Sequence, residues 1–135
     1  MNVVLIVADD LGWADLACYG SDLHETPNLD RLAAQSIRFT DAYAAAAICS
    51  PTRASLLTGK SPTRLGMTIW HEWAARGPDR RGDYVAAEAE PNLKRSEETL
   101  AEVLKPRGYA TFHVGKWHVG DVRHYPETQG FDVNI

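Results

Sequence analysis

The apolar positions of this chain follow two periods, and together they predict an α/β protein. Residues 2–8 form a nearly continuous apolar run rich in β-branched side chains, which is typical of a central strand buried on both faces. Residues 38–43 and 109–114 change character from one position to the next, which fits strands, because successive side chains of a strand face opposite sides. Because helical segments separate these strands, we expect one mostly parallel central sheet flanked by helices.

Three further stretches carry helix signals. Thr26-Pro27 is a helix start, and apolar residues then recur at helical spacing. Ser50 can cap a second helix, with Pro51 at its first position and a glycine at its end. Acidic residues in the first turn favour the third helix. The predicted ranges are 26–37, 50–59 and 96–108.

Between the second and third helices, residues 61–92 have no clear period. Proline, glycine and charged residues punctuate this range, so we expect a long loop region with a short helical piece around residues 70–75. Trp70, His71 and Trp73 fall in that piece. They are candidates to line a substrate pocket, and equally candidates to anchor the loop by apolar contacts.

Composition is that of an ordinary globular chain of 135 residues, 44% hydrophobic and 24% charged, with a formal net charge of −4. It lacks the basic surface or the long apolar run that nucleic acid or a membrane would need, so we expect neither as a partner. Two cysteines are too few for a disulfide framework, and Cys18 is interpreted as a structural thiol. The opening apolar run is too short for a signal peptide. We expect a cytoplasmic protein, or a periplasmic or secreted one if a leader has been removed.

The first candidate for chemistry is Cys49, which directly precedes a predicted helix start. A helix N-terminus attracts anions, because it collects unpaired N–H donors and the positive end of the dipole. Arg53 adds a fixed cation with a planar fork of donors one turn later. The same pattern is also that of a buried structural cysteine before an ordinary capped helix.

Two pairs of polar residues follow predicted strands. Asp9 and Asp10 come after residues 2–8, at the carboxyl end of the strand, where ligands bind in open α/β sheets. A hard metal ion is the simplest reason to place two adjacent carboxylates there, and an acidic turn is the alternative. Lys116 and His118 follow the strand 109–114 and can enter one pocket or remain on the surface.

The sequence Cys49-Ser50-Pro51-Thr52-Arg53, followed by Leu56-Leu57-Thr58-Gly59, resembles the signature of type I sulfatases. These are the formylglycine-dependent sulfatases of the alkaline phosphatase superfamily. Residues 108–118 resemble the second signature of that family, and Asp9-Asp10 resembles its metal-binding start. The resemblance covers nearly the whole chain. It implies an alkaline-phosphatase-like fold, incomplete here, with residues 1–135 as the N-terminal part of a single catalytic domain and 61–92 as its long loop region.

The resemblance also implies roles for six residues. Cys49 would be converted to formylglycine by the formylglycine-generating enzyme, and one hydroxyl of its hydrate would attack sulfur. Asp9, Asp10 and residue 49 would be metal ligands, for calcium as the usual ion of the family, with magnesium as the alternative.

The other three residues would act on the sulfate. Arg53 would hold the hydrate and share the developing charge, and Lys116 would contact the sulfate oxygens. His118 would contact the second hydroxyl and help to expel sulfate.

The predicted function is therefore hydrolysis of sulfate esters, with a sulfated small molecule or carbohydrate as substrate. Two alternatives stay open at this point. Related enzymes of the superfamily cleave phosphonate or phosphate esters, and a truncated copy could be non-catalytic. Further metal ligands lie downstream in the family, so we expect residues 1–135 alone to be inactive.

Overall fold

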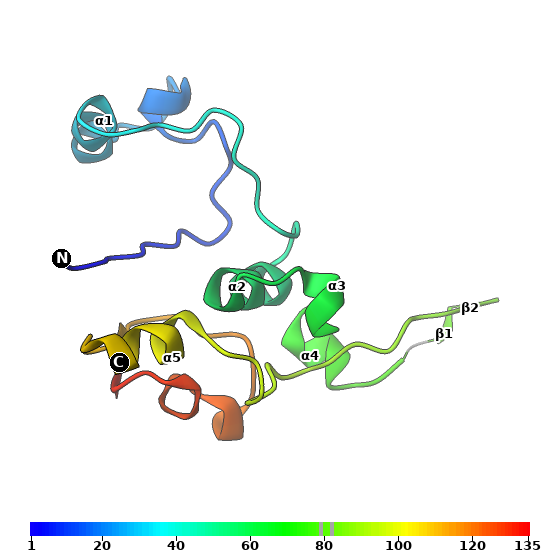
Figure 1. Cartoon of the computed structure of the whole chain (residues 1–135). Helices are drawn as coiled ribbons and strands as arrows, with labels where there is room; N and C mark the ends of the chain where they lie inside the picture. The colour runs from blue at the N-terminus through cyan, green and yellow to red at the C-terminus, as the bar shows by residue number, and fades with distance from the viewer. Residues whose placement is uncertain (79, 82) are drawn as a thin grey trace. The chain divides into compact units, whose positions relative to one another are not determined.

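The computed structural model describes residues 1–78, 80–81 and 83–135 (Figure 1). It divides the chain into two compact units, Met1–Tyr43 and Ala44–Ile135, and each unit is described by itself below. In the described ranges, no helix combines the length and apolar character needed to cross a membrane.

The first unit contains a 3₁₀ turn, η1 (Ala17–Tyr19), packed against helix α1 (Pro27–Ala34). Asp30 on α1 ties the two together, because its Oδ1 accepts the backbone N–H of Cys18 at 2.8 Å and the hydroxyl of Thr26 at 2.9 Å. The predicted helix start at Pro27 is confirmed, although the helix ends at Ala34 and not at Ile37.

Two predicted strands are not formed in the described part of the chain. Neither residues 2–8 nor residues 38–43 belong to a ladder, and every residue from 2 to 8 is exposed. The physical reason is that a strand, unlike a helix, takes its hydrogen bonds from a neighbouring strand. The apolar pattern of residues 2–8 indicates a strand suited to burial, but the pattern cannot supply the neighbour.

The second unit holds the remaining helices. α2 (Cys49–Thr58) contacts both α3 (Pro62–Leu65) and α5 (Leu100–Leu104), and Figure 1 shows α2 beside α3. Gly59 ends α2 in a left-handed conformation (φ 69°), with its N–H bonded to the Ser55 carbonyl at 2.8 Å. The unit also contains α4 (His71–Ala74). Three 3₁₀ turns follow α5, namely η2 (Lys105–Arg107), η3 (Val122–His124) and η4 (Pro126–Gln129).

Helix α5 begins at Leu100, so the predicted start at Ser96 is wrong. Thr99 caps it through a reciprocal pair of bonds: the Thr99 hydroxyl accepts the N–H of Glu102 at 3.3 Å, and the Glu102 carboxylate accepts the N–H of Thr99 at 2.8 Å. This capping box determines the first residue of the helix more strongly than the acidic residues Glu97 and Glu98 do.

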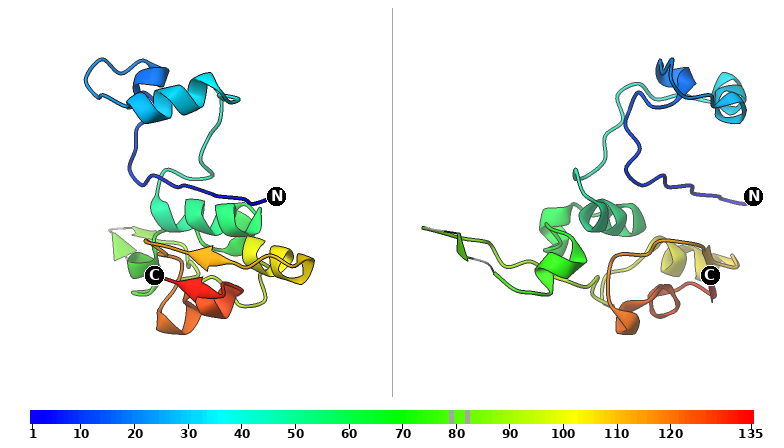
Figure 2. Two further views of the ribbon diagram at one scale, coloured as in Figure 1. Left: turned by 90° about the vertical axis from the view of Figure 1, so that its left-hand side faces the viewer. Right: turned by 180° about the vertical axis from the view of Figure 1, so that it is seen from behind.

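Four short strands complete the unit. β1 (Arg80–Arg81) pairs antiparallel with β2 (Tyr84–Val85), and β3 (Phe112–His113) pairs parallel with β4 (Val133–Asn134). Figure 2 shows β3 and β4 side by side. The predicted strand 109–114 therefore forms over two residues only. Residues 61–92, predicted as a loop region, contain α3, α4, β1 and β2, and the helical piece expected around residues 70–75 is confirmed as α4.

A hydrophobic core holds the second unit together. It joins Ala54 of α2 to Trp117 and Val119, which lie after β3, and all three side chains are buried. Its other buried members are Leu65, Met67 and Leu93, with Leu57 and Phe131 packed against them. Burying one large apolar side chain stabilises a fold by roughly 1.5–3 kcal/mol, so this cluster fixes the neighbouring backbone firmly. Arg53, Lys116 and His118 are direct neighbours of core residues in the sequence.

Asp132, just before β4, is predicted to make folding stability depend on acid pH. The hydrogen bond from Lys105, followed by those from the backbone and side chain of Thr111, lowers the pKa of Asp132 to about 2. The unfolded pKa is about 3.9, so this stabilisation is present above pH 4 and is lost as the pH falls toward 2. Urea unfolding should therefore show a lower free energy of unfolding for Asp132→Asn than for the parent at pH 5, and this difference should shrink as the pH falls to 2. A difference that stayed constant over this pH range would contradict the prediction.

Candidate active site

Cys49 is the first residue of α2 and is half-buried. Ile48, in extended conformation (φ −140°), is the N-cap and makes no side-chain capping bond. The prediction that Ser50 caps this helix is wrong, because Ser50 already lies inside the first turn. Its hydroxyl is buried and accepts the backbone N–H of His71 at 3.1 Å. Ser50 therefore attaches α4 to the first turn of α2.

The connection that leads into Cys49 is fixed by Thr52. Its hydroxyl accepts the N–H of Ala46 at 3.1 Å and donates to the carbonyl of the same residue at 2.7 Å. Both polar groups of one connecting residue are thus bound to the first turn of α2. These two hydrogen bonds hold the backbone on the N-terminal side of Cys49 against the first turn of α2.

Arg53 joins the two sequence motifs in space. Its guanidinium donates to the backbone carbonyl of Lys116 at 2.5 Å, across 63 residues of chain. Ala54 follows Arg53 and Trp117 follows Lys116 in the sequence, and both lie in the same core cluster. Their packing stabilises the contact between Arg53 and Lys116. The structure therefore brings together the helix that begins at Cys49 and the stretch that carries Lys116 and His118.

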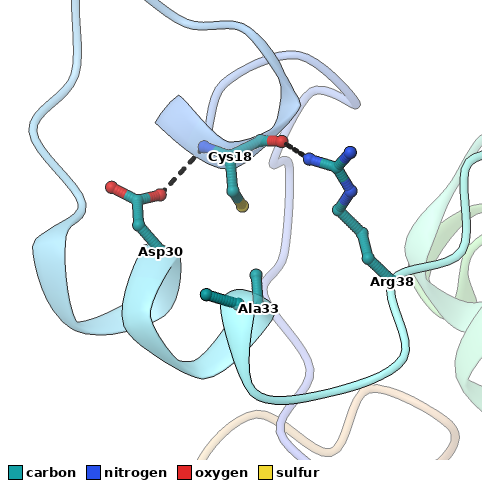
Figure 3. A pocket seen from close by; sticks show the side chains of 5 residues that line it. Cys18, Asp30, Ala33 and Arg38 are labelled. Carbon is teal, nitrogen blue, oxygen red and sulfur yellow. Dashed lines mark hydrogen bonds between the residues drawn. The ribbon is translucent and has the colours of Figure 1, made fainter.

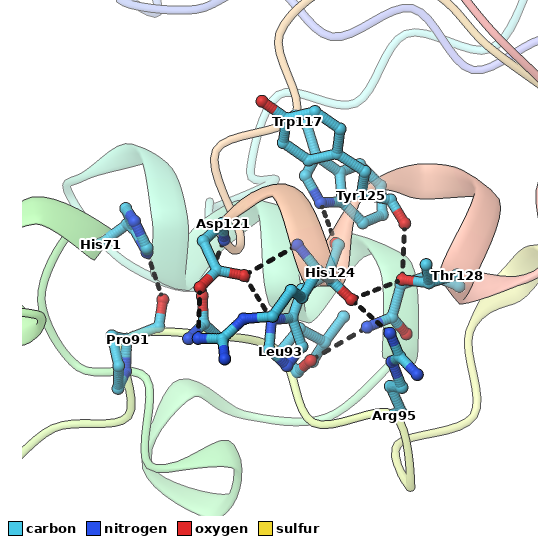
Figure 4. Close-up of polar contacts among 12 residues, drawn as sticks. His71, Pro91, Leu93, Arg95, Trp117, Asp121, His124, Tyr125 and Thr128 are labelled. Atoms are coloured by element: carbon cyan, nitrogen blue, oxygen red, sulfur yellow. Dashed lines mark hydrogen bonds and ion pairs between the residues drawn. The ribbon is translucent and has the colours of Figure 1, made fainter.

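The Lys116–His118 stretch leaves β3 through Gly115 (φ 96°). Buried Trp117 separates Lys116, which is exposed, from His118, which is half-buried. The Trp117 indole donates to the carbonyl of His124 at 2.8 Å (Figure 4). His118 itself has a left-handed backbone (φ 57°), an uncommon conformation for a residue other than glycine. The residues on either side of it, Trp117 and Val119, are both buried.

Sequence reasoning did not find Glu72 on α4, which contacts His118. The Nε2 atom of His118 lies 3.0 and 2.8 Å from the two carboxylate oxygens of Glu72. The hydrogen bond with His118 is the main cause that lowers the pKa of Glu72. Because 46 residues separate the pair, no local period could have revealed it. The sequence offered one signal, namely that Glu72 lies in the helical piece predicted around residues 70–75.

Contacts of α4 favour the interpretation of His71 as an anchor. Its Nδ1–H donates to the carbonyl of Pro91 at 2.6 Å (Figure 4), while its backbone N–H binds Ser50. The rings of Trp70 and Trp73 meet edge to face with centroids 6.1 Å apart. The segment is thus attached at α2 and at the Pro91 loop, which determines where Glu72 lies.

A second polar network supports the stretch after His118. Asp121 accepts from the ring of His124 at 2.8 Å and from Arg123, and its own N–H donates to the Asn92 side chain at 2.8 Å (Figure 4). The hydrogen bonds from His124 and then Arg123 hold the pKa of Asp121 far below its usual range. His124 is therefore engaged in holding this turn.

Asp9 and Asp10, the predicted metal ligands, lie in the first unit and are exposed, whereas the other predicted site residues lie in the second. Asp10 has a left-handed backbone (φ 57°). Their oxygen donors suit a hard divalent cation, so the pair fits such an ion as a partial ligand set. Among residues 1–78, 80–81 and 83–135, no group of three or more His, Cys, Asp or Glu side chains is arranged to hold a metal.

A cavity of about 340 Å³ lies in the first unit, between η1 and α1 (Figure 3). None of the predicted site residues lines it. Asp30 and Arg38 both bind the backbone of Cys18, at its N–H and its carbonyl respectively. The lining residues are Cys18, Asp30, Ala33, Ala34 and Arg38. These contacts agree with the interpretation of Cys18 as a structural residue.

Comparison with known proteins places these features in a family. The model of the family described as Sulfatase matches residues 1–133. Steryl-sulfatase of Mus musculus is 46% identical over 138 residues, which cover 97% of this chain and 21% of the relative. Arylsulfatase A of Homo sapiens is 47% identical over 133 residues, which cover 96% and 24%. The crystal structure of Ps i-CgsB in complex with k-i-k-neocarrahexaose superposes with a TM-score of 0.74 at 35% identity, over 93% of this chain and 25% of that one.

The chain belongs to the sulfatase family. Its fold is the α/β fold of the sulfatases, which is alkaline-phosphatase-like, with helices and a small parallel sheet in the part seen here. The chain spans about a fifth to a quarter of the length of these relatives.

Proposed function

We propose that the protein hydrolyses sulfate esters, with formylglycine made from Cys49 as the nucleophile and residues 1–135 as part of one catalytic domain. The observation that carries the proposal is the bond from Arg53 to the Lys116 carbonyl, because it brings two sequence motifs with sulfatase character into one place. A sulfate ester is an anion with a poor leaving group, so its hydrolysis needs a strong nucleophile and stabilisation of negative charge.

Formylglycine, as its hydrate, supplies the hydroxyl nucleophile at position 49, and the formylglycine-generating enzyme is the partner that this requires. The residues around it then have separate roles. Arg53 orients the hydrate and shares negative charge, and Lys116 contributes a second positive charge for the sulfate oxygens. His118 accepts or returns a proton on the second hydroxyl. The N-terminus of α2 adds fixed dipoles at residue 49.

Asp9 and Asp10, with residue 49, are the proposed ligands for a divalent cation, calcium as the first choice and magnesium as the second. Such an ion, when bound, supplies Lewis acidity toward a sulfate oxygen. The proposed substrates are sulfated small molecules or carbohydrates. The oligosaccharide in the crystal structure of Ps i-CgsB supports the carbohydrate choice.

The test uses the complete protein that contains this sequence, matured in a host with the formylglycine-generating enzyme. We expect it to release sulfate from an aryl sulfate faster than phosphate from the matching aryl phosphate. Dialysis against EDTA should lower the rate by about a hundredfold or more, since the cation stabilises charge in the transition state. Calcium should restore the rate better than magnesium.

Other outcomes would select an alternative. Faster release of phosphate would identify a phosphate ester hydrolase of the same superfamily, and no release from either ester by matured protein would identify a non-catalytic copy. A rate that EDTA leaves unchanged would remove Asp9 and Asp10 from the proposed site.

A further inference from the structure

Glu72 contacts His118 at the nitrogen farthest from the backbone. Both carboxylate oxygens lie within hydrogen-bond distance of Nε2, at 2.8 and 3.0 Å. The His118 side chain is only 19% exposed, whereas that of Glu72 is 58% exposed. The carboxylate therefore reaches from the surface to an imidazole that is mostly enclosed.

The other ring nitrogen of His118 is in a different situation. Nδ1 is buried and has no hydrogen-bond partner within the ranges that the structure describes. A buried polar atom without a partner is uncommon and costs stability, so its presence calls for an explanation. The left-handed backbone of His118 adds strain at the same residue. Such features persist where the surrounding structure holds them and tend to gather at functional sites.

The contact with Glu72 determines which nitrogen of the neutral ring carries the proton. A carboxylate only accepts hydrogen bonds, so Nε2 must be the protonated nitrogen when it faces Glu72. The neutral imidazole then has its lone pair on Nδ1, and that atom is left to take or give a proton. In this arrangement Nε2 is held by Glu72, and the lone pair of Nδ1 stays available for proton transfer.

The hydrogen bonds that attach α4 to the rest of the second unit determine where Glu72 lies. His71, its neighbour, donates from its backbone to Ser50 in the first turn of α2 and from its ring to Pro91. The segment that carries Glu72 is thus bound to the helix that begins at Cys49. Trp117 and Val119, the sequence neighbours of His118, are both buried in the core of the second unit.

We propose that Glu72 is a positioning residue that holds the Nε2–H of His118 and so presents Nδ1 to the reacting groups at position 49. This inference rests on the proposed sulfate ester hydrolysis for the role of His118. Its competitor is an ordinary exposed ion pair, which would contribute little to stability or to rate.

The test compares Glu72→Gln with the parent in the complete, matured protein, with rates divided by the formylglycine content. Loss of a carboxylate that orients a catalytic histidine should lower kcat for an aryl sulfate by about 10- to 100-fold, while KM stays within about twofold. Glu72→Asp, which keeps the charge on a shorter arm, should recover part of the loss. Glu90→Gln is the matched control, because Glu90 is in the same loop region and pairs with Lys94 and not with a histidine. It should behave as the parent.

A second readout does not need turnover. With ¹⁵N-labelled imidazole rings, and the His118 signals assigned from His118→Gln, the neutral form of the parent ring should show a protonated Nε2 and a bare Nδ1. Glu72→Gln should move both signals, and Glu90→Gln should move neither.

Unchanged His118 signals, an unchanged kcat, or a loss confined to KM would each overturn the inference. If the parent itself hydrolysed no sulfate ester while Glu72→Gln still moved the His118 signals, the proposed function would fail and the positioning of the ring would stand.

Discussion

Replacing Cys49 with alanine is expected to abolish sulfate release from aryl sulfates by the complete protein, with a loss on the order of a thousandfold or more, as for removal of a catalytic nucleophile. Cys49 opens α2, with the backbone before it held by Thr52 and the Arg53–Lys116 bond one turn later. Alanine favours the helix and fills less space than cysteine, so the fold should persist. Steady-state rates of sulfate release, beside urea unfolding of both proteins, measure the two effects.

The control for this prediction is Cys18→Ala. The hydrogen bonds of Cys18 to Asp30 and Arg38 both use its backbone, so the sulfur can be removed without breaking them. Turnover should stay within about twofold of the parent, as for a substitution away from the site. Peptide mass spectrometry should find an aldehyde or its hydrate at position 49 and an unmodified thiol at position 18. Residual activity of Cys49→Ala above one tenth of the parent would remove Cys49 from the role of nucleophile.

Features with local causes could be predicted from the sequence. The start of α1 at Pro27, the end of α2 at Gly59 and the short helix α4 all follow from proline, glycine and spacing within a few residues. Helices can be predicted this way because their hydrogen bonds join residues four apart. The error at the start of α5 was local too, because Thr99 with Glu102 outweighed Ser96. The error at Ser50 was not local, because its hydroxyl accepts from His71, 21 positions away.

Features that depend on distant partners could not be predicted. Residues 2–8 read as a buried strand, but a ladder needs a neighbour that no pattern within seven residues can specify. The strand 109–114 shortened to β3, whose partner β4 lies 21 positions away. The same limit hid Glu72, since its role arises only from contact with His118. Resemblance supplied the candidate site, and the structure supplied the contact between Arg53 and Lys116 that joins its two parts.

Replacing Arg53 with alanine is expected to have the second largest effect. The change removes a cation from the first turns of α2 and breaks its bond to the Lys116 carbonyl. Removing one donor that stabilises developing charge costs about 10²- to 10³-fold in rate, so kcat/KM per modified molecule should fall by that amount. In the proposed function Arg53 also belongs to the motif that directs conversion of Cys49, so we expect the modified fraction to fall as well. Mass spectrometry separates the two effects.

Arg53→Lys and Arg107→Ala make this prediction specific. Lysine keeps the charge but lacks the planar fork, so Arg53→Lys should recover only part of the lost rate. Arg107 also donates from its guanidinium to a backbone carbonyl, that of Val103 at 2.5 Å, but it is exposed and outside both motifs. Its replacement by alanine removes the same kind of bond and should leave turnover unchanged. If Arg53→Ala were fully modified at position 49 and turned over within threefold of the parent, the Arg53–Lys116 contact would be structural, and the charge at the sulfate would have to come from elsewhere.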